Sequence, residues 1–274
     1  MSQMSDQEIR SAVLERYRRT ATQGGGCCAG PATGCCGPQA QPPSPQDIST
    51  ALGYSPEDLS AVPEGANLGL GCGNPQAIAQ LQPGETVLDL GSGGGFDCFL
   101  AARQVGERGR VIGVDMTPEM VALARANAAK TGAANVEFRL GEIEHLPVAD
   151  HSVDAILSNC VINLAADKLP VYREAYRVLK AGGRLAISDV VATQPLPAEL
   201  ARDLALWSSC AAGALQVTEL QNILAQVGFV EIAITVDENS RRFIDQWATG
   251  KGLGDYLASA RIQARRPLAS EVAS

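Results

Sequence analysis

The chain has 274 residues, of which 46% are hydrophobic, and carries a formal net charge of −8 at pH 7. A chain of this length can bury a sizeable core. The acidic balance argues against binding to a nucleic-acid backbone, which requires clustered Lys and Arg side chains. No uninterrupted apolar stretch approaches the roughly 18 residues of a membrane span. We therefore expect neither a nucleic-acid nor a membrane partner.

The first 21 residues, "MSQMSDQEIRSAVLERYRRTA", place apolar side chains at helical intervals among charges: Ile9, Val13, Leu14 and Tyr17. This spacing predicts an amphipathic helix. A signal peptide would instead need a compact apolar segment. We therefore expect the protein to reside in the cytoplasm.

Residues 23–46, "QGGGCCAGPATGCCGPQAQPPSPQ", are dense in Gly and Pro and are predicted to form a mobile arm. Half of the eight cysteines lie in this arm, as the pairs Cys27-Cys28 and Cys35-Cys36. Cytosolic thiols are kept reduced, so metal, metalloid or redox chemistry is favoured over structural disulfides. The pairs do not match the C-x₂-C spacing of common zinc sites. A second metalloid site, a thiol relay and an incidental arm remain open.

From Glu85 onward, apolar strands alternate with amphipathic helices. This alternation predicts a parallel sheet covered on both faces. The predicted strands are 86–91, 110–115, 135–140, 153–159, 184–191 and 229–236, and the predicted helices are 96–106, 117–132, 167–180, a stretch around 198–215, and 218–228. We divide the chain into an N-terminal helix and arm (1–50), a cofactor domain (51–192), and a C-terminal segment (193–274) that contributes to the substrate site and completes the sheet.

The turn after the first strand, "VLDLGSGGGF", contains Gly91, Gly93 and Gly95. Glycines there let the backbone approach a ligand closely, beside the free N–H groups of a helix start. The dinucleotide pattern G-x-G-x-x-G would need its last glycine at Phe96, which is bulky. Asp115 ends the second strand, where a carboxylate can accept hydrogen bonds from ribose hydroxyls. A nucleoside cofactor other than a dinucleotide is therefore expected.

Four segments, "VLDLGSGGG", "VIGVD", "GEIEHLP" and "VLKAGGRLAISD", resemble the successive motifs of class I S-adenosylmethionine-dependent methyltransferases over roughly residues 85–190. The resemblance implies a Rossmann-like, doubly wound α/β fold with a mainly parallel seven-stranded sheet and a C-terminal α+β extension. It implies S-adenosylmethionine as cofactor, with its methionine part at the glycine turn, its ribose at Asp115 and its adenine beside Met116, Glu142 and Ile143. The implied cofactor-binding residues are Asp89, Gly91, Gly93, Gly95, Asp115, Met116, Glu142, Ile143 and Asn159.

The methyl acceptor must be judged from the remaining residues. Transfer to oxygen or to a protonated amine usually needs a general base. His145 and His151 are the only histidines and fall in a polar connection, so we expect them to be solvated and assign them no catalysis. Cys72, Cys160 and Cys210 lie near the predicted ligand crevice at the carboxyl ends of the strands. Three soft thiolates would suit trivalent arsenic, whose lone pair carries no proton and needs no base.

Several segments, including "EGANLGLGCGNP", "GVDMTPEM" and "SNCVINL", resemble arsenite methyltransferases from about Gly53 to about Val236. The resemblance implies that Cys72, Cys160 and Cys210 bind trivalent arsenic for methylation in arsenic detoxification. It also implies an upstream cysteine that exchanges disulfides with Cys72, and which of the two cysteine pairs supplies it stays open. Because arsenic is formally oxidised on methylation, an external thiol reductant, glutathione or thioredoxin, is expected.

Two other functions remain as alternatives. One is a carbon methyltransferase of the quinone or sterol type, which has a similar "VLKAGGRLAISDVV" segment. The other is a metalloid-binding protein without catalysis.

Cys98, on the first helix of the cofactor domain, is expected to be a small buried hydrophobe and not a ligand.

Overall fold

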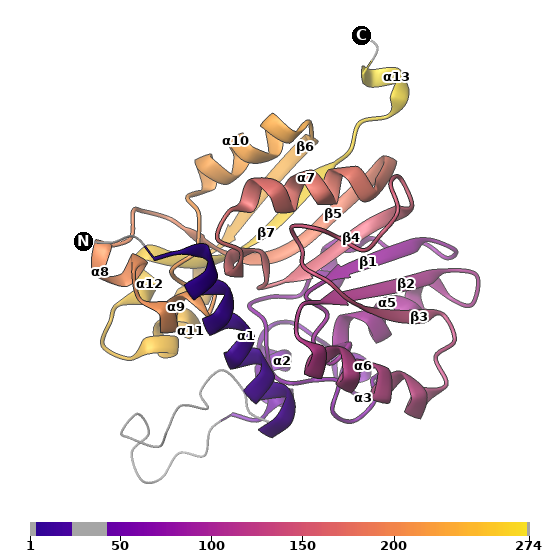
Figure 1. Cartoon of the computed structure of the whole chain (residues 1–274), viewed down its shortest axis with the longest axis horizontal. Coiled ribbons are helices and arrows are strands. Elements are labelled where there is room, and N and C mark those ends of the chain that lie inside the picture. The colour runs from indigo at the N-terminus through magenta and orange to yellow at the C-terminus, as the bar shows by residue number, and fades with distance from the viewer. Residues whose placement is uncertain (1–3, 24–42, 273–274) are drawn as a thin grey trace.

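The computed structural model describes residues 4–23 and 43–272, so the paired cysteines Cys27-Cys28 and Cys35-Cys36 lie outside the described residues. The described chain forms one seven-stranded sheet with strand order β3-β2-β1-β4-β5-β7-β6 (Figure 1). Its strands are β1 (Thr86–Leu90), β2 (Arg110–Asp115), β3 (Val136–Leu140), β4 (Val153–Asn159), β5 (Leu179–Ala192), β6 (Val230–Asp237) and β7 (Leu257–Arg265). The expected doubly wound, mainly parallel sheet is confirmed.

The last strand in sequence, β7, lies between β5 and β6 and runs antiparallel to both. Its pairing with β5 extends from Arg184↔Arg265 to Ala192↔Leu257. The C-terminal segment thus supplies the two strands that complete the sheet.

Helices cover both faces of the sheet (Figure 1). On one face α7 and α10 pack against each other, and on the other α5 packs on β1 and β2 while α6 packs on β2 and β3. The helices are α1 (Asp6–Gln23), α2 (Pro45–Ala51), α3 (Pro56–Ala61), α4 (Gln76–Ala79), α5 (Phe96–Val105), α6 (Pro118–Thr131), α7 (Lys168–Val178), α8 (Ala198–Ala201), α9 (Leu204–Trp207), α10 (Val217–Val227), α11 (Arg241–Asp245), α12 (Leu253–Tyr256) and α13 (Ala269–Val272), with 3₁₀ turns η1 (Ile162–Leu164), η2 (Glu238–Ser240) and η3 (Gln246–Ala248).

Side chains of the central strands alternate between two hydrophobic clusters. Leu88 and Leu90 of β1 pack in the cluster that contains α7 and α10, whereas Val87 packs in the cluster that contains α5 and α6. Because both faces are buried, the strands are almost continuously apolar, as parallel strands are in α/β folds. The polar residues of these strands therefore lie at the strand ends, along the edge of the sheet where α/β folds bind ligands.

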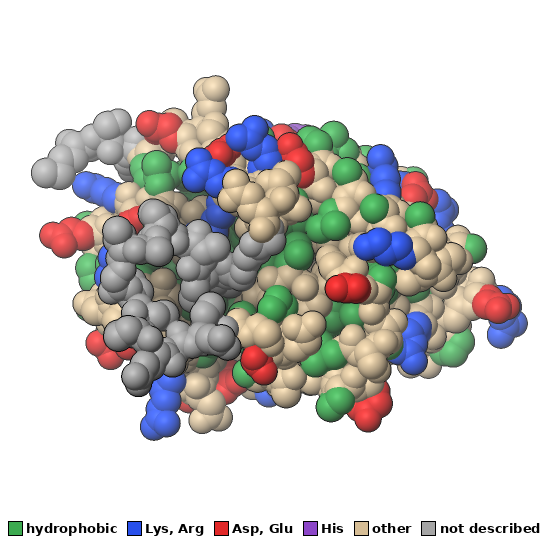
Figure 2. Space-filling model, turned by 90° about the horizontal axis from the view of Figure 1, so that it is seen from below, with side chains coloured by type: hydrophobic (Ala, Val, Ile, Leu, Met, Phe, Trp, Pro, Cys, Tyr) green, Lys and Arg blue, Asp and Glu red, His purple; other side chains and the backbone are tan. Residues whose placement is uncertain are grey.

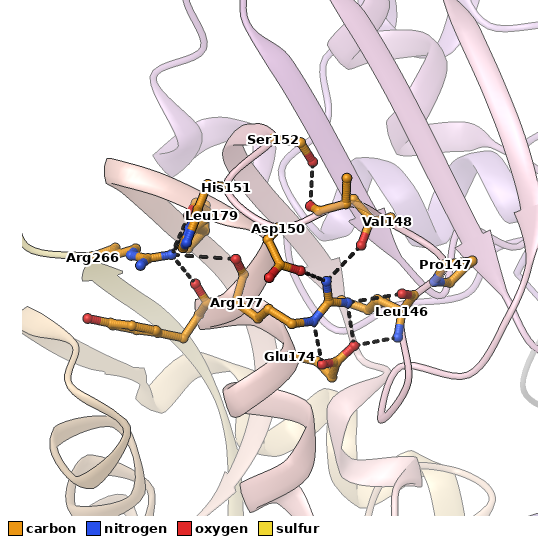
Figure 3. Close-up of polar contacts among 12 residues, drawn as sticks. Leu146, Pro147, Val148, Asp150, His151, Ser152, Glu174, Arg177, Leu179 and Arg266 are labelled. Carbon is orange, nitrogen blue, oxygen red and sulfur yellow. Dashed lines mark hydrogen bonds and ion pairs between the residues drawn. The ribbon is translucent and has the colours of Figure 1, made fainter.

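Helix α7 ends earlier than the sequence predicts. The predicted helix 167–180 stops at Val178, and β5 already begins at Leu179, which pairs with Val153. Polar contacts hold this junction, as Figure 3 shows: the Arg266 guanidinium donates to the carbonyl oxygen of Leu179 at 2.7 Å and contacts the His151 ring. His151 is exposed, as expected, and its ring also contacts the Arg266 side chain at this helix–strand junction.

The predicted helical stretch at 198–215 is also interrupted. The Asp203 carboxylate accepts the N–H groups of Ala205 and Leu206 and so begins a separate helix, α9. That helix ends at Trp207, and Cys210 lies in the following turn with φ of +64°. Cys210 therefore belongs to a turn and not to a helix–helix contact.

The face of the molecule in Figure 2 shows basic side chains interspersed with acidic ones. None of the helices in residues 4–23 and 43–272 has the length and apolarity to cross a bilayer.

Candidate active site

A cavity of about 550 Å³ opens at the carboxyl ends of β1, β2 and β4. Its lining includes Gly91, Gly93 and Asp115 as well as Cys160 and Cys210. The glycine turn and two of the predicted arsenic-binding cysteines thus face one shared space. This is the edge of the sheet where α/β folds bind their ligands.

Three glycines of the first turn adopt left-handed backbone, with φ of +67° at Gly91, +51° at Gly93 and +93° at Gly95. A Cβ atom at Gly91 would lie 2.4 Å from the side chain of Val161, so only glycine fits there. The Gly93 N–H donates to Asp115 Oδ2 at 2.9 Å, and the Thr117 N–H donates to Asp115 Oδ1 at 2.8 Å. These bonds fix the turn against the end of β2.

The surroundings of Asp115 fit a nucleoside. Burial raises the pKa of its carboxyl, whereas the N–H groups of Thr117 and Gly93 lower it. The carboxylate lines the cavity beside the apolar side chains of Met116 and Ile143. A Cβ atom at Gly93 would meet nothing within 4 Å, so the backbone there is open to a ligand. An acceptor for ribose hydroxyls, apolar walls for a flat base and an open glycine backbone suit S-adenosylmethionine.

Three predicted cofactor residues are not among the described residues that line the cavity. Asp89 is buried and accepts a hydrogen bond from Cys98 Sγ at 3.2 Å. Gly95 precedes α5, and a Cβ atom there would lie 2.8 Å from the Phe138 ring. Glu142 pairs with Arg10 at 3.0 Å. Each has a structural partner, so their cofactor role stays a prediction.

Asn159, the last residue of β4, connects the cavity to Cys72. Its Oδ1 accepts the Cys72 N–H at 3.1 Å, and its Nδ2 donates to the Gly73 carbonyl at 2.9 Å and to the Tyr54 hydroxyl at 3.1 Å. Tyr54 in turn donates to Asp97 Oδ1 at 2.8 Å. Asn159 lines the cavity and also fixes the backbone of a predicted arsenic-binding cysteine, and its cofactor role stays a prediction.

The three predicted cysteines lie together in one buried cluster. Cys72, Cys160 and Cys210 are 2%, 7% and 2% exposed. The sulfur atoms of Cys72 and Cys160 lie within 4.8 Å of each other. Cys210 Sγ donates to the carbonyl oxygen of Cys160 at 2.6 Å. The structure therefore brings together three residues that are separated by up to 138 positions in sequence.

The thiols are protonated near neutral pH. Burial raises the pKa of Cys72 to about 11, although its hydrogen bond with Cys160 lowers it. Burial also raises the pKa of Cys210 well above its usual range. Cys98 lies outside this cluster and is fully buried, as expected for a small hydrophobe, although its Sγ also donates to Asp89.

Cys160 and Cys210 both adopt left-handed backbone, with φ of +59° and +64°. Such conformations are uncommon for non-glycine residues and are maintained by surrounding contacts. The Cys160 N–H donates to the Ser188 carbonyl at 2.8 Å, and the Cys210 N–H donates to the Trp207 carbonyl at 2.9 Å. These bonds hold the two turns in place.

The sequence did not reveal that α1 belongs to the site. Ile9 and Val13, whose spacing predicted the helix, are buried and line the cavity. Arg10 pairs with Glu142 at 3.0 Å and with Glu144 at 3.7 Å. The amphipathic pattern identified the buried face of α1, but it carried no information on which surface that face would cover.

Comparisons with known proteins identify the family to which this chain is similar. A family model described as a methyltransferase domain matches residues 81–228. An arsenite methyltransferase of Halobacterium salinarum is 51% identical over 267 residues, which cover 95% of this chain and 67% of that protein. An arsenite methyltransferase of Aquipseudomonas alcaligenes is 44% identical over 70% of this chain and 57% of its own length. The chain thus spans between about half and two thirds of these relatives.

A solved structure is also similar. The crystal structure of an arsenic(III) S-adenosylmethionine methyltransferase from Chlamydomonas reinhardtii superposes with a TM-score of 0.59 at 33% identity, covering 83% of this chain and 74% of that one. The matching domain, the identity over nearly the whole chain and the shared fold lead to one conclusion. The chain belongs to the arsenite methyltransferase family of S-adenosylmethionine-dependent methyltransferases.

Proposed function

We propose that this chain methylates trivalent arsenic held by Cys72, Cys160 and Cys210, and that the reaction serves arsenic detoxification. One observation carries the proposal: three thiols from distant segments form one cluster beside the cavity that contains the glycine turn and Asp115. The family's curated members from Halobacterium salinarum and Aquipseudomonas alcaligenes are arsenite methyltransferases, which supports the same substrate.

Arsenic loading needs no net proton transfer to solvent. Burial holds the thiols in their protonated form. When arsenite binds, each thiol proton leaves with one arsenic hydroxyl as water, and each sulfur forms a bond to arsenic. Three such exchanges give a neutral arsenic tris-thiolate. Soft thiolates are the ligands that a soft, thiophilic centre prefers.

The protein's contribution to methyl transfer is chiefly positioning. When bound, S-adenosylmethionine supplies an electrophilic methyl group. Gly91, Gly93 and Asp115 would hold it, and the thiols would fix the direction of the arsenic lone pair. Orientation of this kind contributes a large part of many enzymatic rate enhancements. The arsenic lone pair carries no proton, so the exposed ring of His145 needs no role as a base.

Arsenic is formally oxidised from +III to +V when it receives the methyl group. A dithiol must supply two electrons to restore the trivalent state and is itself oxidised to a disulfide. We propose that glutathione or thioredoxin provides these electrons in the cytoplasm. Cys27, Cys28, Cys35 and Cys36 stay candidates for an exchange with Cys72.

The test is an assay with purified protein, arsenite, S-adenosylmethionine and thiol, in which methylarsenicals are measured by chromatography coupled to mass spectrometry. Cys72→Ser, Cys160→Ser and Cys210→Ser should each abolish arsenite binding and methylation. Cys98→Ser is the matched control, because it is a buried cysteine outside the cluster and serine keeps the hydrogen bond to Asp89. Equal activity in the three cluster variants and in the control would refute the proposal.

A further inference from the structure

A buried carboxylate lies beside the cysteine cluster. Asp189, near the end of β5, is 2% exposed. One of its oxygens and the sulfur atoms of Cys72 and Cys160 all lie within 4.8 Å of one another. Neither the sequence motifs nor the proposed function assigns Asp189 a role.

The hydrogen bonds of Asp189 select its ionised form. Oδ1 accepts the Val190 N–H at 2.8 Å and an Asn163 Nδ2 hydrogen at 2.9 Å. Oδ2 accepts the Ile162 N–H at 3.0 Å and the Asn163 N–H at 3.4 Å. All four partners are N–H donors, and a protonated carboxyl would direct its own O–H at one of them. The site therefore holds a negative charge in a fixed place.

This charge does not help the thiols to ionise. Burial chiefly, and the Asp189 charge in addition, raise the pKa of Cys72, against the lowering effect of the Cys160 hydrogen bond. A negative group beside three thiols thus opposes thiolate formation. A negative group in this position would instead stabilise a neighbouring centre that becomes positive during a reaction.

This inference rests on the proposed function. In the proposed reaction, arsenic becomes positively charged during methyl transfer. The tris-thiolate of trivalent arsenic is neutral. Its lone pair forms the arsenic–carbon bond while the methyl–sulfur bond of the sulfonium breaks, and the electron pair of the broken bond stays on sulfur. The positive charge passes from sulfur to arsenic, which goes formally from +III to +V. No proton moves in this step.

We propose that Asp189 stabilises the positive charge that develops on arsenic in the transition state of methyl transfer. The carboxylate is held by fixed donors before the reaction begins, so it needs no reorganisation when the charge appears. Because the arsenic tris-thiolate is neutral, the charge of Asp189 contributes little to arsenite affinity. Asp189 therefore acts on the rate of methyl transfer through its charge and is not an arsenic ligand.

Lys168 opposes this effect. Its ammonium donates to the carbonyl oxygens of Ala165 at 2.7 Å and Asn163 at 3.4 Å and lies 5.1 Å from the centre of the Trp207 ring. Its positive charge acts on Asp189, where it lowers the carboxyl pKa that burial raises. Removing this cation should strengthen the field that Asp189 exerts at arsenic.

The test separates arsenite affinity from the methyl-transfer rate in Asp189→Asn. Affinity is measured by tryptophan fluorescence, since Trp247 lines the cavity and Trp207 lies close to Cys210 in sequence and structure. The rate is measured in a single turnover with both substrates bound. We expect an arsenite dissociation constant within about threefold of the wild type and a single-turnover rate reduced about 100-fold, the effect of losing one preorganised electrostatic group.

Ser208→Ala is the structural control, because it removes a buried hydroxyl that donates to the Ala205 carbonyl near the turn of Cys210 and leaves Asp189 and its four donors in place. This variant should retain the wild-type rate per bound arsenic. If Asp189→Asn loses arsenite affinity and rate in parallel, or if Ser208→Ala loses as much rate per bound arsenic, Asp189 has only a structural role and the inference is overturned. A normal rate per bound arsenic in Asp189→Asn overturns it as well.

Lys168→Met keeps the inference testable if Asp189→Asn does not fold. Lys168 also lowers the pKa of Asp189, so the rate is measured as a function of pH. Above the pH at which Asp189 ionises in the variant, loss of the opposing cation should raise the single-turnover rate about threefold. A slower rate per bound arsenic in that pH range would contradict the inference. Activity of the wild type distinguishes failure of the proposed function from failure of the role given to Asp189. If the wild-type protein forms no methylarsenical, the proposed function fails. If the wild type is active, the variants test the role of Asp189.

Discussion

Gly213 packs against the segment that follows Cys160, and this contact sets the spacing of two proposed arsenic ligands. A Cβ atom at Gly213 would lie 2.0 Å from the carbonyl oxygen of Asn163, where ordinary contacts begin near 3.4 Å. Gly213→Ala must therefore separate the turn of Cys210 from the turn of Cys160 by about 1 Å or more. The substitution changes no thiol and no residue of the glycine turn.

A shift of this size exceeds the tolerance of about 0.2 Å for ligand distances at bound metals. We expect arsenite affinity to fall by about 10- to 100-fold or more, as when residues that orient metal ligands are changed. S-adenosylmethionine affinity should fall less than arsenite affinity, because the N–H groups of Gly93 and Thr117 hold Asp115, although Val161 beside Gly91 belongs to the segment that shifts. Arsenite is titrated by tryptophan fluorescence, and S-adenosylmethionine by calorimetry.

The matched control is Gly132→Ala at the end of α6. Gly132 has φ of +65°, and a Cβ atom there would meet nothing within 4 Å. Its replacement should destabilise the fold by about 1–2 kcal/mol through backbone strain alone. Unchanged arsenite affinity in folded Gly213→Ala, or an equal loss in Gly132→Ala, would refute the reasoning.

Three further predictions concern the cofactor, a buried lysine and α1. Asp115→Asn removes the charged acceptor at the end of β2 and should lower S-adenosylmethionine affinity about 10- to 100-fold in calorimetry, with arsenite affinity unchanged; equal affinity would exclude Asp115 as a ribose ligand. Burial lowers the pKa of Lys168 to about 8 in the folded protein, from 10.5 in the unfolded chain. Between these two pH values Lys168 is protonated in the unfolded chain and neutral in the folded protein. The free energy of unfolding therefore rises with pH across this range. The free energy of unfolding of the wild type relative to Lys168→Met, measured in denaturant, should therefore increase by about 3 kcal/mol from pH 8 to 10.5, and a constant difference would contradict the shift. Ile9→Ala, in the buried face of α1, should speed amide hydrogen exchange of that helix far more than Arg10→Ala does. The ion pair of Arg10 is about half exposed and should contribute less than about 1 kcal/mol to stability. Similar exchange rates in the two variants would show that charge, and not apolar burial, holds α1.

The parts of the fold that the sequence predicted are those with local signals. The alternation of apolar strands and amphipathic helices placed β1 to β4 within one residue, because buried parallel strands and their helices have distinct periodicities, whereas β5 begins five residues before its predicted start. Gly93 and Asp115 were found for a similar reason: Gly93 lies in the turn after β1, and Asp115 is the last residue of β2. The end of α7 was missed because Leu179 is equally suited to a helix, and its pairing with Val153 decides the outcome.

The parts that the sequence could not supply depend on tertiary contacts. The position of β7 follows from its pairing with both β5 and β6, which no local pattern encodes. Asp189 stood in a recognised motif, but its distance from Cys72 appears only when strand β5 and the segment before β1 are assembled. A polar residue near the carboxyl end of a buried strand was the available signal for it.

The left-handed backbone of Cys160 and Cys210 sets folding preference against chemistry. Glycine, and to a lesser degree asparagine, adopts this conformation more readily than cysteine does. A glycine at either position would relax the turn while deleting a sulfur, so Cys160→Gly should melt at a higher temperature than Cys160→Ala although both lack the thiol. Folding alone would therefore favour glycine at both turns, and the proposed binding of arsenic accounts for cysteine there.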